Sequence, residues 1–258
     1  MPATEDVRGQ DPPLRRIDLA WRVVVVVAIV AGIAAFIVAV HGTGGAGDPA
    51  AAQTRAAADA PATIATAVKR SVDVFGHLGD GKPWTRMANP NRQGAPLVFL
   101  VERRTSGWLH VLLPTRPNGA QGWIKESDVG LSKTDYRVDV SLRRHRVVVH
   151  KGGRTVVDRP AAVGTSKTPT PTGRFFVTVL LRPPDPKGAY GPYAFGLSAH
   201  SATLFHFGGG PGQIGMHGTD EPKALGHAVS NGCVRMSDAT VTKLAGLLPL
   251  GTPVTIAS

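Results

Sequence analysis

The sequence predicts a mostly-β protein in which two β domains follow a single membrane-spanning helix. Over most of the chain, apolar residues alternate with polar ones in short runs that Gly and Pro interrupt, a pattern typical of half-buried strands. One uninterrupted apolar run, Val23–Val40, lies near the N-terminus, and one helical pattern, Asp238–Leu247, lies near the other end. With 258 residues and 42% hydrophobic side chains, the chain is long enough for two modest domains with packed cores.

The run Val23–Val40 contains no charged residue and as a helix would span about 27 Å, close to the ~30 Å hydrocarbon core of a bilayer. Three arginines closely precede it, whereas only Arg55, between two aspartates, closely follows. By the positive-inside rule, residues 1–22 form a cytoplasmic tail and everything after His41 lies outside the cell. A cleaved signal peptide is the alternative, but its apolar region is usually about 7–15 residues long. We therefore expect an uncleaved, single-pass anchor over residues 23–40.

Residues 41–62 contain mainly Gly, Ala, Pro, Thr and Asp, which cannot bury enough apolar surface to fold. They predict a flexible tether between the membrane and the folded part. The net charge of +11 lies in that folded part, where basic residues outnumber acidic ones twofold in both halves. No Arg/Lys run with interleaved aromatics is present, so we expect no nucleic acid. An anionic extracellular polymer explains the charge equally well, but charge alone does not choose the partner. Solvated surface charge without a partner is the alternative.

The first β domain is predicted over residues 63–132. Turn signals such as Asn89-Pro90 separate strands expected at Leu97–Glu102, Trp108–Leu113 and Gly122–Lys125. The stretch Gly107–Pro114 with the following Arg116–Gly119 and Gly122–Ile124 resembles bacterial SH3-like domains. That resemblance implies a small β-barrel, which either holds wall peptides or glycan or acts as a spacer with Trp108 and Trp123 in its core.

The second β domain is predicted over residues 133–258. A Gly152-Gly153 turn predicts a hairpin, and Ser237 is the expected N-cap of the helix Asp238–Leu247. Residues 182–200, rich in Pro and Gly and carrying Tyr190 and Tyr193, form either a lid over the site or an irregular connection. The strands expected in this domain are Arg137–Leu142, Arg146–His150, Thr155–Val157, Phe175–Leu180, Leu204–Phe207 and Pro253–Ala257.

The lone cysteine, Cys233, ends the tight turn Ser230-Asn231-Gly232-Cys233, and His217 lies sixteen positions upstream. A thiol is nucleophilic as thiolate, and a nearby histidine can take its proton. Gly232 permits a close backbone approach to a bound carbonyl, so the turn residues Ser230, Asn231 and Gly232 are the expected oxyanion-stabilising segment. The alternative for a free cysteine is a small buried apolar residue.

These residues carry a family resemblance. Ile214-Gly215-Met216-His217-Gly218-Thr219, followed by Ser230, Gly232, Cys233, Val234 and Arg235, resembles the paired motif of the L,D-transpeptidase (YkuD-type) catalytic domain, over residues 134–257. The resemblance implies a β-sandwich-like barrel and a Cys233 nucleophile. It also implies that His217 is the base, oriented by the backbone carbonyl of Gly218, with Asp220 as a weaker alternative. Asn231 departs from the motif, which usually has a second histidine there.

Two further residues are expected to bind substrate. Arg235 has the planar fork that suits a carboxylate, although a structural ion pair is its alternative role. Tyr193 is placed in the substrate site through the loop 182–200. The histidines His200, His206 and His227 match no compact zinc-ligand spacing, so we expect no metal and, for acyl transfer, no cofactor.

The function implied is a peptidoglycan L,D-transpeptidase of the cell membrane, with its catalytic domain on the wall side and roles in cell wall biogenesis and cell shape. Cys233 would attack the carbonyl after the third residue of a tetrapeptide stem, releasing D-alanine. An amine of a neighbouring stem would then form a 3→3 cross-link. An L,D-carboxypeptidase or wall peptidase with the same Cys/His pair, and a non-catalytic wall-binding protein, remain alternatives. The oligomeric state is left open.

Overall fold

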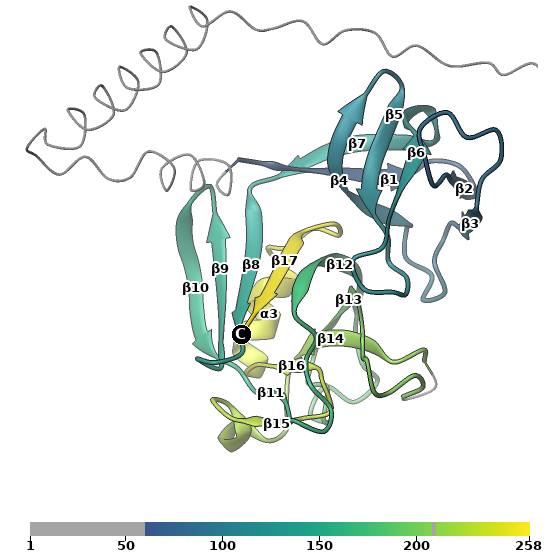
Figure 1. Cartoon of the computed structure of the whole chain (residues 1–258). Helices are drawn as coiled ribbons and strands as arrows, with labels where there is room; N and C mark the ends of the chain where they lie inside the picture. Colours follow the sequence, from purple (N-terminus) through teal and green to yellow (C-terminus); the bar gives the residue numbers. More distant parts are fainter. Residues whose placement is uncertain (1–59, 208–209) are drawn as a thin grey trace, which may run out of the picture. The chain divides into compact units, whose positions relative to one another are not determined.

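The computed structural model describes residues 60–207 and 210–258. The tail 1–22 and the anchor 23–40 expected from the sequence lie outside the described residues, as does nearly all of the tether 41–62. Within the described ranges no helix is both long enough and apolar enough to cross a bilayer. Strands dominate these ranges, and α3 (Asp238–Ala245) is their one α-helix, so the prediction of a mostly-β fold is confirmed (Figure 1).

The smaller sheet has five antiparallel strands in the order β6-β5-β4-β1-β7. Its core contains Phe99, Leu109 and Ile124, all fully buried. Trp123 is also buried, whereas Trp108 is half-buried and lies edge-on to Phe75 with ring centroids 5.1 Å apart. The SH3-like assignment stays a prediction. The strands are β1 (Ala62–Ala67), β4 (Val98–Thr105), β5 (Trp108–Leu112), β6 (Gln121–Lys125) and β7 (Val129–Thr134), beside the hairpin β2 (Ser71–Val74) and β3 (Thr85–Ala88).

The larger sheet has eight strands in the order β10-β9-β8-β17-β12-β13-β14-β16 (Figure 1). Only the pairs β8–β17 and β14–β16 are parallel. A separate two-stranded ladder joins β11 (Val163–Gly164) to β15 (Ala228–Ser230). The strands of the sheet are β8 (Tyr136–Ser141), β9 (Arg146–Lys151), β10 (Arg154–Pro160), β12 (Gly173–Leu181), β13 (Ala194–His200), β14 (Gln213–His217), β16 (Val234–Arg235) and β17 (Pro253–Ala257).

Alternation explains the outer strands of this sheet. In β9, Val147 and Val149 are fully buried while the residues between and beside them are partly exposed, as expected for a strand covered on one face. Helix α3 begins where Ser237 accepts a hydrogen bond from the Thr240 backbone N–H at 3.2 Å, the expected N-cap. Its Val241 and Leu244 complete the same core.

Two sequence-based assignments are wrong. Leu204–Phe207 is not a strand: the Ser201 hydroxyl accepts hydrogen bonds from the backbone N–H groups of Thr203 and Leu204, which a strand would offer to a neighbour. Conversely, the end of the predicted loop 182–200 is strand β13, which lies between β12 and β14. Its residues Phe195, Leu197 and Ala199 do alternate with Gly196 and Ser198, but the Pro- and Gly-rich residues before them made the whole stretch resemble a loop.

The two sheets share a small hydrophobic cluster. Phe176 of β12 is fully buried against Ile64, Val98, Leu100 and Leu112 of the smaller sheet. Polar contacts also join the two sheets, as where the Arg174 guanidinium on β12 donates to Glu102 on β4 at 2.8 Å.

Candidate active site

His217 is the last residue of β14, and its side chain is only 4% exposed. The ring Nδ1 lies 2.7 Å from the Gly218 carbonyl oxygen. A carbonyl only accepts, so Nδ1 carries the proton and Nε2 keeps its lone pair. This is the orientation that the sequence resemblance implied for a base. Asp220 is exposed and forms no hydrogen bond or ion pair with the ring among the residues that the structure describes.

Cys233 lies in the short connection between β15 and β16, within a turn held by side chains. The Ser230 hydroxyl donates to the Cys233 carbonyl at 2.6 Å and accepts from the Gly232 N–H at 3.1 Å. The Thr170 hydroxyl donates to the Gly232 carbonyl at 2.8 Å. Gly232 has φ of +111°, a conformation that favours glycine. Ser230 and Gly232 therefore fix the turn that presents the thiol, rather than leaving these groups free for a ligand.

Gly215 of β14 brings the thiol and the imidazole together. Its backbone N–H donates to Cys233 Sγ at 3.3 Å. A Cβ added at Gly215 would lie 3.9 Å from Cys233 Sγ and 3.9 Å from His217 Cδ2, so both groups border the same small volume. The parallel pairing of Met216 with Val234 sets this arrangement, because Cys233 directly precedes the paired residue of β16. The sequence motif gave no separate role to Gly215.

The electrostatics of the pair favour its neutral form. Burial lowers the pKa of His217 to about 4, with the Gly218 carbonyl opposing this shift and the positive charge of Arg235 adding to it. Burial also raises the pKa of the Cys233 thiol, against the Gly215 N–H and Arg235, which both favour the thiolate. At neutral pH the site therefore holds a thiol beside an imidazole free to accept its proton.

A tyrosine of the loop before β13 covers His217. The Tyr190 ring lies 4.7 Å from the imidazole, centroid to centroid, at 50°. Tyr190 is 42% exposed, and burial together with the nearby Cys233 raises its pKa. Tyr193, the tyrosine expected to bind substrate, is instead half-buried against the core, and the Arg182 guanidinium lies 5.5 Å above its ring. Tyr190 is thus the tyrosine whose ring faces His217, whereas the Tyr193 carbonyl accepts a hydrogen bond from the Gly218 N–H at 3.4 Å.

Asp238, the first residue of α3, holds the backbone beside His217. Its Oδ1 accepts a hydrogen bond from the Thr219 N–H at 3.0 Å. A Cβ at Gly218 or at Gly191 would collide with this same oxygen, so the two glycines are required for the close approach of loop, turn and helix. Sequence reasoning identified Asp238 only as a helix start, because nothing in its local sequence links it to a turn nineteen residues away.

Two further residues, Arg235 and Asn231, were also predicted at the site. Arg235 donates to Glu221 at 2.9 Å, the structural ion pair that was its alternative role. Asn231 is exposed at the outside of the turn. The described residues contain no group of three or more His, Cys, Asp or Glu side chains placed to hold a metal ion.

The geometry can support proton transfer and nucleophilic attack. A thiol and a neutral imidazole both lie beside Gly215, the imidazole is fixed in one tautomer, and an aromatic ring limits access from one side. These are the groups that an acyl transfer through a thioester needs.

Residues 135–256 are similar to a known family of proteins. The model of the L,D-transpeptidase catalytic domain, YkuD, matches residues 135–256. The putative L,D-transpeptidase YkuD of Bacillus licheniformis is 38% identical over an alignment of 152 residues that covers 56% of this chain and 84% of that protein. The protein of the same name from Bacillus subtilis is 36% identical over 121 residues, 47% of this chain and 65% of its own length. The crystal structure of an L,D-transpeptidase from Mycobacterium tuberculosis H37Rv aligns with a TM-score of 0.41 at 18% identity, over 82% of this chain and 86% of that one.

Proposed function

The chain belongs to the L,D-transpeptidase (YkuD) family, and from that premise we propose that it forms 3→3 cross-links in peptidoglycan through an acyl-enzyme on Cys233. The observation that carries the proposal is the shared volume beside Gly215, where the thiol meets an imidazole whose Nδ1–H is held by the Gly218 carbonyl. His217 is proposed as the base and Gly218 as the residue that orients it.

The first half of the reaction consumes a donor stem. His217 Nε2 takes the thiol proton as Sγ attacks the carbonyl of the third stem residue, forming the S–C bond. The C–N bond to the terminal D-alanine then breaks, and the proton on Nε2 passes to the leaving amine. Because both groups are neutral beforehand, no charged pair has to be maintained in a buried site between turnovers.

The second half transfers the acyl group. The amine of a neighbouring stem attacks the thioester, its proton passes to Nε2, the S–C bond breaks, and the thiol is re-formed. The oxyanion of each step would develop beside the turn 230–233. The Gly232 N–H is used inside that turn, so the proposed donors are the backbone N–H groups of Asn231 and Cys233.

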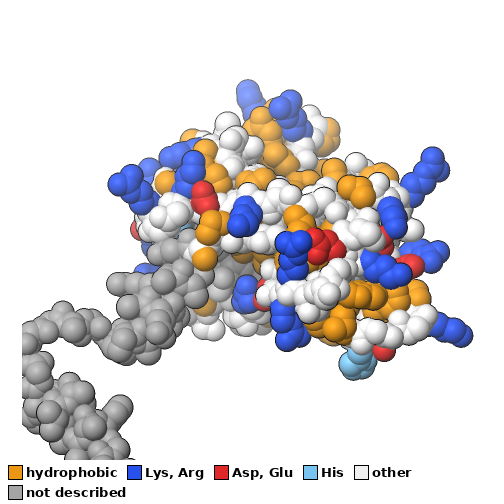
Figure 2. All heavy atoms as spheres, turned by 90° about the horizontal axis from the view of Figure 1, so that it is seen from above, with side chains coloured by type: hydrophobic (Ala, Val, Ile, Leu, Met, Phe, Trp, Pro, Cys, Tyr) orange, Lys and Arg blue, Asp and Glu red, His pale blue; other side chains and the backbone are white. Residues whose placement is uncertain are grey.

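Surface charge is consistent with a wall polymer as substrate. Figure 2 shows Lys and Arg side chains spread over the face in view, with few acidic side chains between them. Such a surface attracts an anionic polymer without selecting one sequence or residue. Arg235 and Tyr193 remain proposed substrate residues, although their contacts with Glu221 and with the core favour supporting roles.

The test is mass spectrometry of the purified full chain, kept in non-ionic detergent, after incubation with a disaccharide-tetrapeptide. Transfer predicts a cross-linked dimer that has lost one D-alanine. A disaccharide-tripeptide as the sole product would show an L,D-carboxypeptidase instead, and no product would favour a wall-binding protein. Cys233→Ala is the control and should give neither product.

We also propose that residues 23–40 anchor the protein with its catalytic part on the wall side. Their composition supports this, since eighteen apolar residues follow a basic flank. The chain should remain in the membrane fraction after a high-salt wash with its N-terminus intact, and protease added to wall-stripped cells should remove residues after His41. An N-terminus mapped to residues 42–60 would show cleavage and refute the anchor.

A further inference from the structure

A threonine-rich loop, residues 165–172, connects β11 to β12 and packs against the turn 230–233 that carries the thiol. Gly164 makes this packing possible. A Cβ at Gly164 would lie 2.3 Å from the Thr168 carbonyl oxygen and 2.5 Å from the Thr170 backbone nitrogen. The loop therefore folds back closely on its own start, and in this conformation two of its hydroxyl groups reach the turn.

Each of these two hydroxyls donates a hydrogen bond to a carbonyl of the turn. Thr168 Oγ1 donates to the Ser230 carbonyl at 3.1 Å, and Thr170 Oγ1 donates to the Gly232 carbonyl at 2.8 Å. Thr170 is only 3% exposed, and its oxygen also accepts from the Gly164 N–H at 2.8 Å. The Thr170 hydroxyl is therefore held from both sides, with its proton directed at the turn.

The two carbonyls belong to the peptide groups that contain the proposed oxyanion donors. The Ser230 carbonyl shares a planar peptide group with the N–H of Asn231, and the Gly232 carbonyl shares one with the N–H of Cys233. Both peptide bonds are trans, so each N–H points away from its own carbonyl. Because both carbonyls point at the threonine loop, both N–H groups lie on the opposite side of the turn.

These two N–H groups have no protein acceptor. Neither the Asn231 N–H nor the Cys233 N–H donates a hydrogen bond to a group within residues 60–207 and 210–258, which the structure describes. The N–H between them, that of Gly232, donates to the Ser230 hydroxyl at 3.1 Å. The turn thus presents two alternate N–H groups on one side, an arrangement in which both can donate to one oxygen atom.

We infer that Thr168 and Thr170 are positioning residues for the oxyanion of the acyl transfer. They hold the peptide groups so that the N–H groups of Asn231 and Cys233 face the same side. By donating to the carbonyls of those peptide groups, they also polarise the two N–H groups and make them better donors. This inference rests on the proposed acyl transfer, because the oxyanion forms only when the thiol attacks a carbonyl. Thr170 should matter more, since its bond is shorter and acts on the peptide group of the nucleophile itself.

The test compares two reactions of Cys233 in the full chain, kept in non-ionic detergent. With p-nitrophenyl acetate, Sγ attacks the ester carbonyl, an oxyanion forms, and p-nitrophenolate leaves. With iodoacetamide, Sγ displaces iodide from a CH₂ group, and no oxyanion forms. The ratio of the acylation rate to the alkylation rate, both measured by intact-protein mass spectrometry, therefore reports oxyanion stabilisation separately from the reactivity of the thiol. Cys233→Ala corrects for labelling at other residues.

Thr170→Val keeps the shape of the side chain but removes the hydroxyl, and it should lower this ratio at least about tenfold. The expected loss is smaller than the roughly 10²–10³ seen when an oxyanion donor is removed outright, because the Cys233 N–H stays in the chain. Thr168→Val should lower the ratio less. Thr170→Ser restores the hydroxyl and should keep the ratio within about threefold of the parent.

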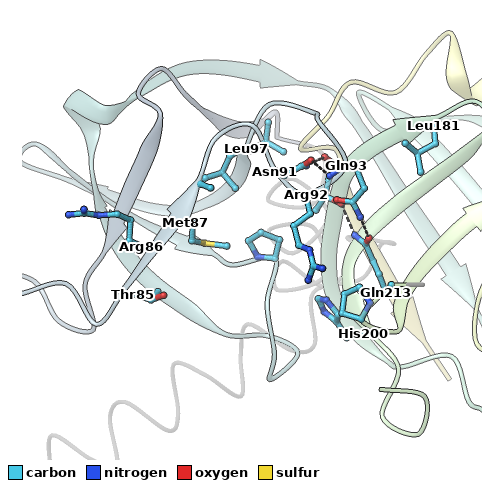
Figure 3. A pocket seen from close by; sticks show the side chains of 16 residues that line it. Thr85, Arg86, Met87, Asn91, Arg92, Gln93, Leu97, Leu181, His200 and Gln213 are labelled. Carbon is cyan, nitrogen blue, oxygen red and sulfur yellow. Dashed lines mark hydrogen bonds between the residues drawn. The ribbon is translucent and has the colours of Figure 1, made fainter. Parts of the chain in front are cut away.

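Two control variants each remove a polar side chain elsewhere. Thr172→Val removes an exposed hydroxyl of the same loop that forms no hydrogen bond with the turn among the described residues. Gln93→Ala removes a hydrogen bond to β14, where Gln93 Nε2 donates to Gln213 Oε1 at 2.8 Å, beside a cavity of about 610 Å³ between the two sheets (Figure 3). None of the turn or loop residues 165–172 lines that cavity. Both control variants should keep the parental ratio.

An unchanged ratio in Thr170→Val would overturn the inference, as would an equal loss in Thr170→Ser or in either control variant. A parent chain that forms no acetyl adduct on Cys233, with or without alkylation, would overturn it too. Failure of the proposed cross-linking is a separate result. If the chain transfers no stem peptide but the ratio falls in Thr170→Val and is kept in Thr170→Ser, the proposed 3→3 transfer is wrong and the role of the threonines stands.

Discussion

Acidification should destabilise the fold through one buried side chain, His217. Its pKa is about 4 in the folded chain against 6.5 ordinarily, because burial penalises the charged ring. Between pH 6.5 and pH 4, His217 is protonated in the unfolded chain but stays neutral in the folded chain. The contribution of His217 to the free energy of unfolding is therefore complete above pH 6.5 and is lost as the pH falls toward 4. A difference of this size corresponds to about 3 kcal/mol, a large share of the roughly 5–15 kcal/mol typical of a folded protein.

The assay is urea unfolding of the full chain at pH 7.5 and pH 4, for the parent and for His217→Gln. The parent should lose about 3 kcal/mol more than the variant over this interval. His77→Gln, which removes a ring with a 91% exposed side chain, is the control for histidine loss in general. If the variant and the parent lose the same free energy, His217 is not the buried neutral base described here.

Three more outcomes follow from the site. Cys233→Ser and Cys233→Ala should abolish the acyl-enzyme, measured as a covalent mass increase, with the unfolding midpoint retained, whereas a serine variant with near-parental rate would rule out the thiol mechanism. Asn231→His should change the acylation rate little, because Asn231 is exposed and one base suffices; a rise of about tenfold or more with a second ionisation in the pH–rate profile would contradict this. Gly191→Ala should destabilise by about 1–3 kcal/mol in urea unfolding, since the new methyl group would collide with Asp238 and Gly218 at a φ of +62°, and a neutral result would disprove the tight packing there.

Local patterns predicted the elements whose surroundings are simple. Alternation identified β9, and a serine before the helical pattern identified the start of α3, because each signal depends on near neighbours. Strand β13 was missed, because the Pro- and Gly-rich residues that precede it made the whole segment 182–200 resemble an irregular connection.

The candidate site also contains features that the local sequence predicts and features that depend on tertiary contacts. The paired motif predicted that His217 and Cys233 act together, and both side chains do lie beside Gly215, while their catalytic roles stay predictions. Which of two nearby tyrosines approaches the imidazole was not predictable, because an irregular loop has no period from which to infer a facing direction. The choice of Tyr190 over Tyr193 depends on the close packing of Gly191 against α3, which is a tertiary contact.

Phe176 has a practical consequence for anyone who wishes to produce the catalytic part alone. A fragment that begins near residue 135 would keep this phenylalanine but lose Ile64, Val98, Leu100 and Leu112, which cover it. Re-exposing one such ring costs about 1.5–3 kcal/mol and leaves an apolar patch open to other molecules. Ile64 also packs over Gly251, so truncation would uncover the turn before β17 as well. The smaller sheet thus covers Phe176. A fragment that begins near residue 135 should therefore aggregate under conditions in which a chain that keeps the smaller sheet stays monodisperse.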